Sequence, residues 1–141
     1  MTVRQLATFV LEGARYGIDV LRVQEALRPQ ERTPVPLAPA GTAGLVNLRG
    51  QVVLTFDLRI RLGLEPLADD AEPMMLVVRL GDEPVSLLVD EIGDVVDVDE
   101  DTFAPPPDTL DPALRDVVLG AYALPEGLLL ALDVERAVAT L

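Results

Sequence analysis

Histidine, cysteine, tryptophan and lysine are all absent from this 141-residue sequence, and its eleven basic residues are all arginine. These absences exclude a Ser–His dyad, a Schiff-base lysine and a histidine metal cluster, and they leave no thiols for disulfides or metal sites. The one serine, Ser86, stands between Val85 and Leu87 in an apolar run, which indicates a structural role. The sequence therefore predicts no tightly bound transition metal and no cofactor.

Carboxylates are the one catalytic resource that remains, because paired acids can catalyse hydrolysis, as in glycosidases. Acids that could form such a pair are Asp90, Glu91 and Asp94. Aromatic residues, which usually stack against sugars, make up only 4% of the chain. The run Asp97 to Asp101 resembles the start of a calcium loop, but Thr102 and Asp108 stand where an EF-hand needs glycine and glutamate. We predict no metal site and keep a carboxylate-based hydrolase only as the enzyme alternative.

The formal net charge is -13, so the surface repels phosphate backbones and a nucleic-acid partner is not expected. Residues Met1 to Leu11 interleave polar and apolar side chains, unlike a signal peptide. No apolar run approaches the roughly 20 residues that a membrane-spanning helix needs. These features predict a soluble protein without direct membrane insertion, and the missing thiols fit a cytoplasmic location.

Alternating apolar and polar residues dominate the chain, and twelve prolines limit the length of its elements. The segments from Val52 to Leu58, from Leu76 to Leu80 and from Leu128 to Val134 each have the two-residue period of a strand. Half of the residues are hydrophobic, enough to build a core from aliphatic side chains. The pattern predicts a mostly β protein whose helices are confined to short pieces near Leu21, Arg59 and the C-terminus.

Two segments have helical spacing. Apolar residues recur at Val20, Val23 and Leu27, and Asp19 is placed to cap a helix there. The C-terminal segment from Val134 to Leu141 is the second candidate, with Asp133 as its cap. Periodicity alone predicts a short helix in each segment.

The two halves of the chain resemble each other. A shift of 76 positions places Gly44–Leu58 on Gly120–Val134, so that Phe56-Asp57-Leu58 falls on Leu132-Asp133-Val134. Each half also begins with a hairpin, turning at Gly13 and at Gly81. The correspondence suggests two similar β subdomains, although a chance match of apolar strands stays open at this point.

Two stretches resemble the CheW family of chemotaxis coupling proteins. Residues 16–25 read YGIDVLRVQE, and residues 44–53 read GLVNLRGQVV, followed by DLR at 57–59. Weaker similarity continues through Leu88–Ile92, Pro105–Pro107, Gly120 and Leu129–Val134. The resemblance extends from about residue 5 to the end of the chain.

The resemblance implies an all-β, CheW-like domain over residues 1–141, made of two small five-stranded SH3-like β-barrels packed together with short helical pieces. We expect one subdomain to comprise about 14–65, and the other about 5–13 together with 73–141. It also implies that Val23 to Leu27 is largely a strand after a short turn, against the helical spacing.

The resemblance further implies a non-catalytic adaptor that couples the cytoplasmic tips of chemoreceptors to the regulatory domain of the histidine kinase CheA. A related adaptor of another pathway, such as pilus-driven motility, is the alternative within the family. The residues expected to bind partners are Val20, Val23, Gln24, Glu25, Arg49, Leu88 and Val89. Those expected to shape the backbone are Gly44, Asn47 and Gly50.

Arg49 has two possible roles. It could pair with Glu25 inside the barrel, because a buried charge is costly unless it is paired and a guanidinium suits a carboxylate. Its removal would then be strongly destabilising. Alternatively, Arg49 is exposed and contacts the kinase, and its removal would leave stability nearly unchanged.

Overall fold

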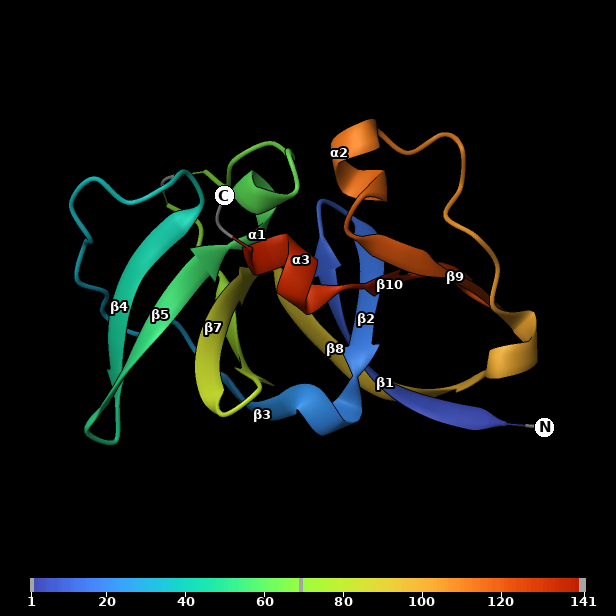
Figure 1. The fold of residues 1–141 in the computed structure, drawn as a ribbon, viewed down its shortest axis with the longest axis horizontal. Coiled ribbons are helices and arrows are strands. Elements are labelled where there is room, and N and C mark those ends of the chain that lie inside the picture. The colour runs from blue at the N-terminus through green and yellow to red at the C-terminus, as the bar shows by residue number, and fades with distance from the viewer. Residues whose placement is uncertain (1, 69, 140–141) are drawn as a thin grey trace.

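A computed structural model describes residues 2–68 and 70–139, and it consists of two five-stranded sheets that lie side by side (Figure 1). The first, which we call the terminal barrel, has the order β8 (Glu91–Asp99), β1 (Val3–Leu11), β2 (Ala14–Asp19), β10 (Gly127–Leu132) and β9 (Val118–Leu124). The second, the central barrel, has the order β3 (Val23–Leu27), β6 (Met74–Leu80), β7 (Glu83–Val89), β5 (Gln51–Asp57) and β4 (Thr42–Leu48). The predicted all-β fold of two five-stranded units is confirmed.

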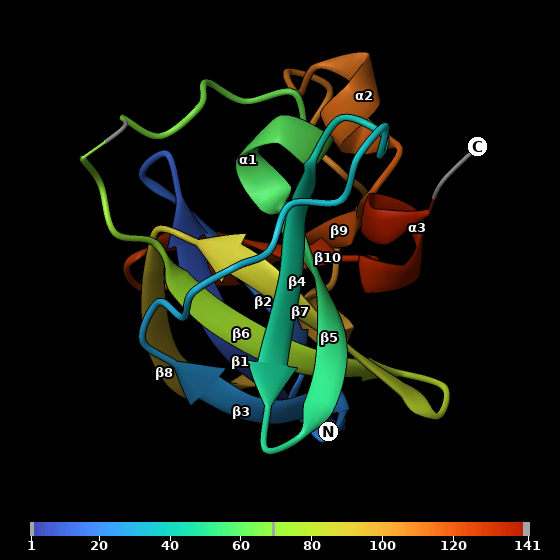
Figure 2. The same cartoon turned by 90° about the vertical axis from the view of Figure 1, so that its left-hand side faces the viewer.

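Each sheet curls until one outer strand meets the segment that follows the other outer strand through one isolated bridge, and Figure 2 shows the central barrel from the side of β4 and β5. In the central barrel, Thr33 and Leu45 exchange two backbone hydrogen bonds of 2.8 Å. In the terminal barrel, Ala104 and Ala121 do the same at 2.9 and 2.8 Å. The bridges close both barrels and cover the strand edges that would otherwise be exposed.

The strands are divided between the barrels differently from the expected halves. The segment 14–19 pairs with β1 in the terminal barrel, whereas the hairpin 74–89 lies in the central barrel. The chain crosses between barrels after Asp19 and again at Asp90. In the terminal barrel, β10 from the second half of the chain pairs in parallel with β2 of the first hairpin. In the central barrel, β5 from the first half pairs in parallel with β7 of the hairpin 74–89. The two halves of the chain have thus exchanged their hairpins.

The internal repeat has a direct structural counterpart. A shift of 76 residues carries β4 onto β9, and it carries α1 (Leu58–Arg61) onto the start of α3 (Val134–Val138). Asp57 and Asp133 cap these helices through their side chains, as the shift predicts. Similar sequences thus form the same strand–turn–strand–helix unit in both barrels.

The helical segments are short. Val20–Arg22 forms one 3-10 turn, η1, and β3 follows directly, so the strand implied by the family resemblance is correct and the longer helix is not. α3 ends at Val138, and residues 140–141 of the expected C-terminal helix lie outside the described residues. The other short elements are η2 (Glu100–Thr102) and α2 (Pro112–Arg115).

The core has three parts. The largest cluster lies between the barrels and combines Phe9 and Tyr16 of the terminal barrel with Leu87 and Val89 of the central one. A smaller cluster around Leu129 belongs to the terminal barrel alone. Another, built from Val46, Met75 and Leu88, belongs to the central barrel. Because the shared cluster is the largest, burial of apolar surface holds the two barrels against each other.

Candidate functional site

The segment from Val20 to Glu25 crosses between the barrels and carries most of the residues predicted to bind partners. Asp19 Oδ1 accepts a hydrogen bond from the Leu21 amide at 2.9 Å, which starts the η1 turn. Val20 and Val23 are half-buried, and Val23 packs against the inter-barrel core. Gln24 is exposed and accepts a hydrogen bond from Arg79 at 3.3 Å. This crossover therefore presents both apolar and polar groups at the surface.

Arg49 occupies the tip of the β4–β5 hairpin, in a two-residue turn with Gly50. Both residues have positive φ angles, 54° and 85°, as a type I′ turn requires. The Asn47 side chain stabilises the turn by accepting a hydrogen bond from the Gly50 amide at 2.9 Å. The local sequence Asn-Leu-Arg-Gly thus places Arg49 at the tip of the hairpin.

Arg49 reaches across to Glu25 and forms a bidentate ion pair with it. Its two terminal nitrogens lie 2.5 and 2.6 Å from the two carboxylate oxygens. The Arg49 side chain is 72% exposed, whereas that of Glu25 is 17% exposed. The hydrogen bonds from Arg49 hold the pKa of Glu25 below its ordinary value. The hypothesis of a buried pair is wrong, because the cation lies in water and only the carboxylate is shielded.

The pair spans the gap between β3 and β4, the two outer strands of the central barrel. A hollow of about 210 Å³ lies beside it and is lined by Leu27, Gln30 and Leu48 as well. The guanidinium is the exposed part of this barrel end, and it has donors free to contact a second protein. Geometry therefore places Glu25 and Arg49 together on a surface.

We expect Arg49→Ala and Glu25→Ala to unfold at urea concentrations close to that of the wild type. The pair is solvent-exposed on the arginine side, and exposed pairs contribute little to stability. A double-mutant cycle measured by urea denaturation should show weak coupling. Strong coupling, with the double variant much less damaged than the sum of the single variants, would instead support a buried structural pair.

Leu88 and Val89 do not lie on the predicted surface. Leu88 is 4% exposed within the central-barrel cluster, and Val89 is fully buried between the barrels. β7 is paired on both sides, by β6 and β5, and apolar clusters cover both of its faces. The prediction that Leu88 and Val89 bind partners is therefore wrong, because neither side chain reaches the surface.

Gly44 permits a close approach of two backbone segments. It has a φ of 120°, and a Cβ atom there would lie 2.7 Å from the carbonyl oxygen of Thr33. Thr33 is the residue that bridges to Leu45 and closes the barrel. A side chain at Gly44 would push this closing segment away.

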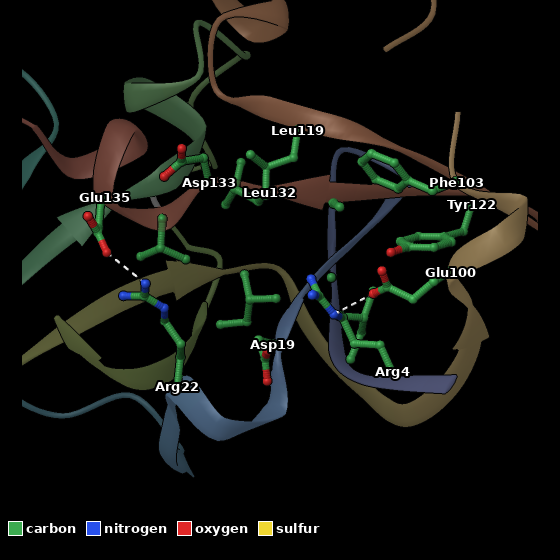
Figure 3. Close-up of a pocket in the computed structure, with 15 residues that line it drawn as sticks. Arg4, Asp19, Arg22, Glu100, Phe103, Leu119, Tyr122, Leu132, Asp133 and Glu135 are labelled. Carbon is green, nitrogen blue, oxygen red and sulfur yellow. Dashed lines mark ion pairs between the residues drawn. The ribbon is translucent and has the colours of Figure 1, made fainter. Parts of the chain in front are cut away.

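The structure adds surface residues that the sequence did not single out. Leu21 is 87% exposed. In the sequence, its exposure was indicated by one feature: Leu21 is apolar but lies outside the helical spacing of Val20 and Val23. Arg22 of the same turn lines a pocket of about 370 Å³ that runs along β2, β10 and the start of α3 (Figure 3). Two ion pairs flank the pocket, Arg4 with Glu100 and Arg22 with Glu135, each at 2.7 Å.

Asp90, one of the acids that could form a hydrolytic pair, has a structural role instead. Asp90 forms a bidentate ion pair with Arg59, at 2.8 and 2.5 Å, and both side chains are about one-seventh exposed. Burial alone would raise the pKa of Asp90, but hydrogen bonds from Arg59 and from the Glu12 amide outweigh it and lower the pKa. A general acid needs a raised pKa, so Asp90 is unsuited to that role.

Among residues 2–68 and 70–139, no group of three or more metal-ligating side chains comes together. Over the same residues, no helix is long and apolar enough to cross a membrane. Two barrels sharing one core, with a charged hairpin tip and an exposed crossover, define a protein-binding module.

Comparisons with known proteins agree with this class. Residues 5–141 match the family model described as a CheW-like domain. The chain is 29% identical to a chemotaxis protein CheW of Klebsiella aerogenes over 94% of its own length and 80% of that protein's. It is 32% identical to CheW of Bacillus subtilis over 76% of its own length and 69% of that protein's. The crystal structure of the scaffolding protein TtCheW from Thermoanaerobacter tengcongensis superposes with a TM-score of 0.81 at 26% identity, covering 93% of this chain and 89% of that one.

The chain belongs to the CheW family. It is a chemotaxis scaffold protein and not an enzyme, which resolves the choice between adaptor and hydrolase.

Proposed function

We propose that this protein couples chemoreceptors to the histidine kinase CheA in the cytoplasm. The observation that carries the proposal is the presence of two unlike surfaces on one protein. One is the Glu25–Arg49 pair at the end of the central barrel, with its exposed guanidinium. The other is the crossover, where Val20, Leu21 and Val23 present apolar surface. A coupling protein must hold two partners at once, so separate surfaces are what it requires.

The crossover suits the cytoplasmic tip of a receptor. Receptor tips are helical, and an amphipathic helix binds by laying its apolar side chains against a hydrophobic groove. Leu21 and Val3 are exposed beside a hollow of about 450 Å³ that Val20 also lines. The barrel end at Arg49 suits the kinase regulatory domain, where a carboxylate or backbone carbonyl could accept hydrogen bonds from the guanidinium.

The proposal is tested by mixing the purified protein with a receptor cytoplasmic fragment and with the regulatory domain of CheA from the same organism. We expect each to bind alone and all three to form one complex in sedimentation velocity. Arg49→Ala should weaken kinase binding while leaving receptor binding and stability unchanged. Leu21→Ser should weaken receptor binding while leaving kinase binding and stability unchanged. Arg136→Ala is a matched control for Arg49, because Arg136 is 71% exposed on another element.

Failure of both partners to bind the folded wild type would contradict the proposal. Binding to the kinase and receptors of a pilus-motility system in preference to those of chemotaxis would support the alternative pathway.

A further inference from the structure

Each of the two crossovers between the barrels forms an ion pair with the same position of a short helix. At the β7–β8 crossover, Asp90 pairs with Arg59, the second residue of α1. At the β2–β3 crossover, Arg22 pairs with Glu135, the second residue of α3. The 76-residue shift relates Arg59 to Glu135. The same helix position in each repeat therefore forms an ion pair with one crossover, with the cation on the helix in one repeat and the anion on the helix in the other.

The two ion pairs differ in burial. The Arg59 and Asp90 side chains are 14% and 15% exposed, whereas those of Arg22 and Glu135 are 40% and 62% exposed. An exposed pair is weaker than a buried one and is screened by salt. The β2–β3 crossover is therefore the more loosely held of the two.

Little else holds η1 in place. None of its three residues is buried, and its other polar contacts are the local turn bonds to Asp19 and Val20. Within the part of the chain that the structure describes, Arg22–Glu135 is the one ion pair or hydrogen bond that a side chain of η1 makes. Figure 3 shows Arg22 rising from this turn toward Glu135 at the edge of the pocket.

Glu135, by contrast, stands on a fixed helix. Val134, Ala137 and Val138 of α3 are buried in the inter-barrel core. Arg61 of α1 also donates a hydrogen bond of 2.9 Å to the Ala137 carbonyl. The ion pair thus ties a loosely held apolar turn to a firmly held helix.

We propose that Glu135 is a positioning residue for the receptor-binding surface: through Arg22 it fixes η1, and so sets where Val20 and Leu21 stand when an amphipathic helix docks. This inference rests on the proposed function, but the positioning of η1 can be measured without any partner. Holding the turn in place before docking reduces the ordering cost of binding.

The test compares Glu135→Ala, Arg22→Ala and the charge-swapped double variant R22E/E135R with the wild type. Hydrogen exchange of the Leu21 and Val23 amides should accelerate about two- to fivefold in both single variants, the range of an exposed ion pair, and the double variant should restore it. Receptor-fragment affinity should fall and recover in parallel. Glu126→Ala, which removes the exposed Arg15–Glu126 pair at 3.2 Å, is the matched control and should change neither measurement.

Unchanged amide exchange in Glu135→Ala would overturn the proposal whether or not receptors bind. Weakened affinity in both single variants without recovery in the swapped double variant would also overturn it, because the two residues would then contact the partner independently. If the wild type binds no receptor while the exchange results hold, the proposed function fails and the positioning role of Glu135 stands.

Discussion

Replacing Gly120 with alanine is expected to destabilise the protein by about 3 kcal/mol, the upper part of the range for overpacking a tight site. A Cβ atom there would overlap the carbonyl oxygen of Ala104 and the ring of Phe103. The ring can move, but Ala104 bridges to Ala121 and closes the terminal barrel. Relief of the overlap must therefore break the closing hydrogen bonds, and urea denaturation measures the loss.

Other glycines separate steric overlap from backbone strain. Gly50 has a positive φ but no atom within 4 Å of the position that a Cβ would take, so Gly50→Ala should cost about 1–2 kcal/mol from conformation alone. Gly44, the repeat equivalent of Gly120, combines positive φ with overlap, so its alanine variant should be at least as damaging as Gly120→Ala. A Gly120→Ala variant as stable as the wild type, with protected Ala104 and Ala121 amides, would contradict this account of barrel closure.

Asp90→Asn and Arg59→Met are each expected to destabilise the protein by about 2–3 kcal/mol at neutral pH. Each leaves one member of a largely buried, bidentate ion pair without its partner. Asp90 also accepts a hydrogen bond from the Glu12 amide at 2.8 Å, and Arg59 donates one to the Glu65 carbonyl at 2.9 Å. The pair therefore connects α1, the β1–β2 turn and the crossover between barrels. Arg59→Lys should recover little, because an ammonium group cannot form the same fork.

The contribution of Asp90 should depend on pH. Its pKa in the folded protein is lowered, so the folded state holds the proton less tightly than the unfolded state does. The stabilisation is then complete above the ordinary aspartate pKa of about 4 and is lost as the pH falls through the lowered folded-state value. Urea denaturation from pH 7 to 3 should show wild type and Asp90→Asn converging at low pH. Asp82→Asn, in an exposed turn, should follow the wild type throughout; a gap for Asp90→Asn that did not change with pH would contradict the assignment.

Local sequence was sufficient for most strands, but not for β3, and it was sufficient for the internal repeat. A two-residue apolar period depends only on neighbouring side chains, and so does the placement of turns at glycine and proline. The match between Gly44–Leu58 and Gly120–Val134 located a unit that both barrels share, including the helix caps Asp57 and Asp133. The family was also evident, because Asn47 to Gly50 has a specific pattern that the turn geometry explains.

Burial and long-range pairing were beyond local sequence. Leu88 and Val89 are adjacent apolar residues whose side chains face opposite sides of the sheet, yet both are buried, because whether a strand lies at the centre of a sheet depends on pairing with distant segments. Charge and chemistry suggested the Glu25–Arg49 pair, but they left open whether Arg49 is buried or exposed. The exchange of hairpins between halves, which brings Arg59 to Asp90 and Arg22 to Glu135, joins residues 31 and 113 positions apart.

The sequence by itself thus determined which chemistry this protein lacks, most of the strands it forms and which family it belongs to, because these follow from composition and local pattern. Tertiary structure alone decided which charges are shielded and which apolar residues reach the surface. The physical reason is that desolvation depends on everything that packs around a group, and in this fold those neighbours come from segments distant in the sequence.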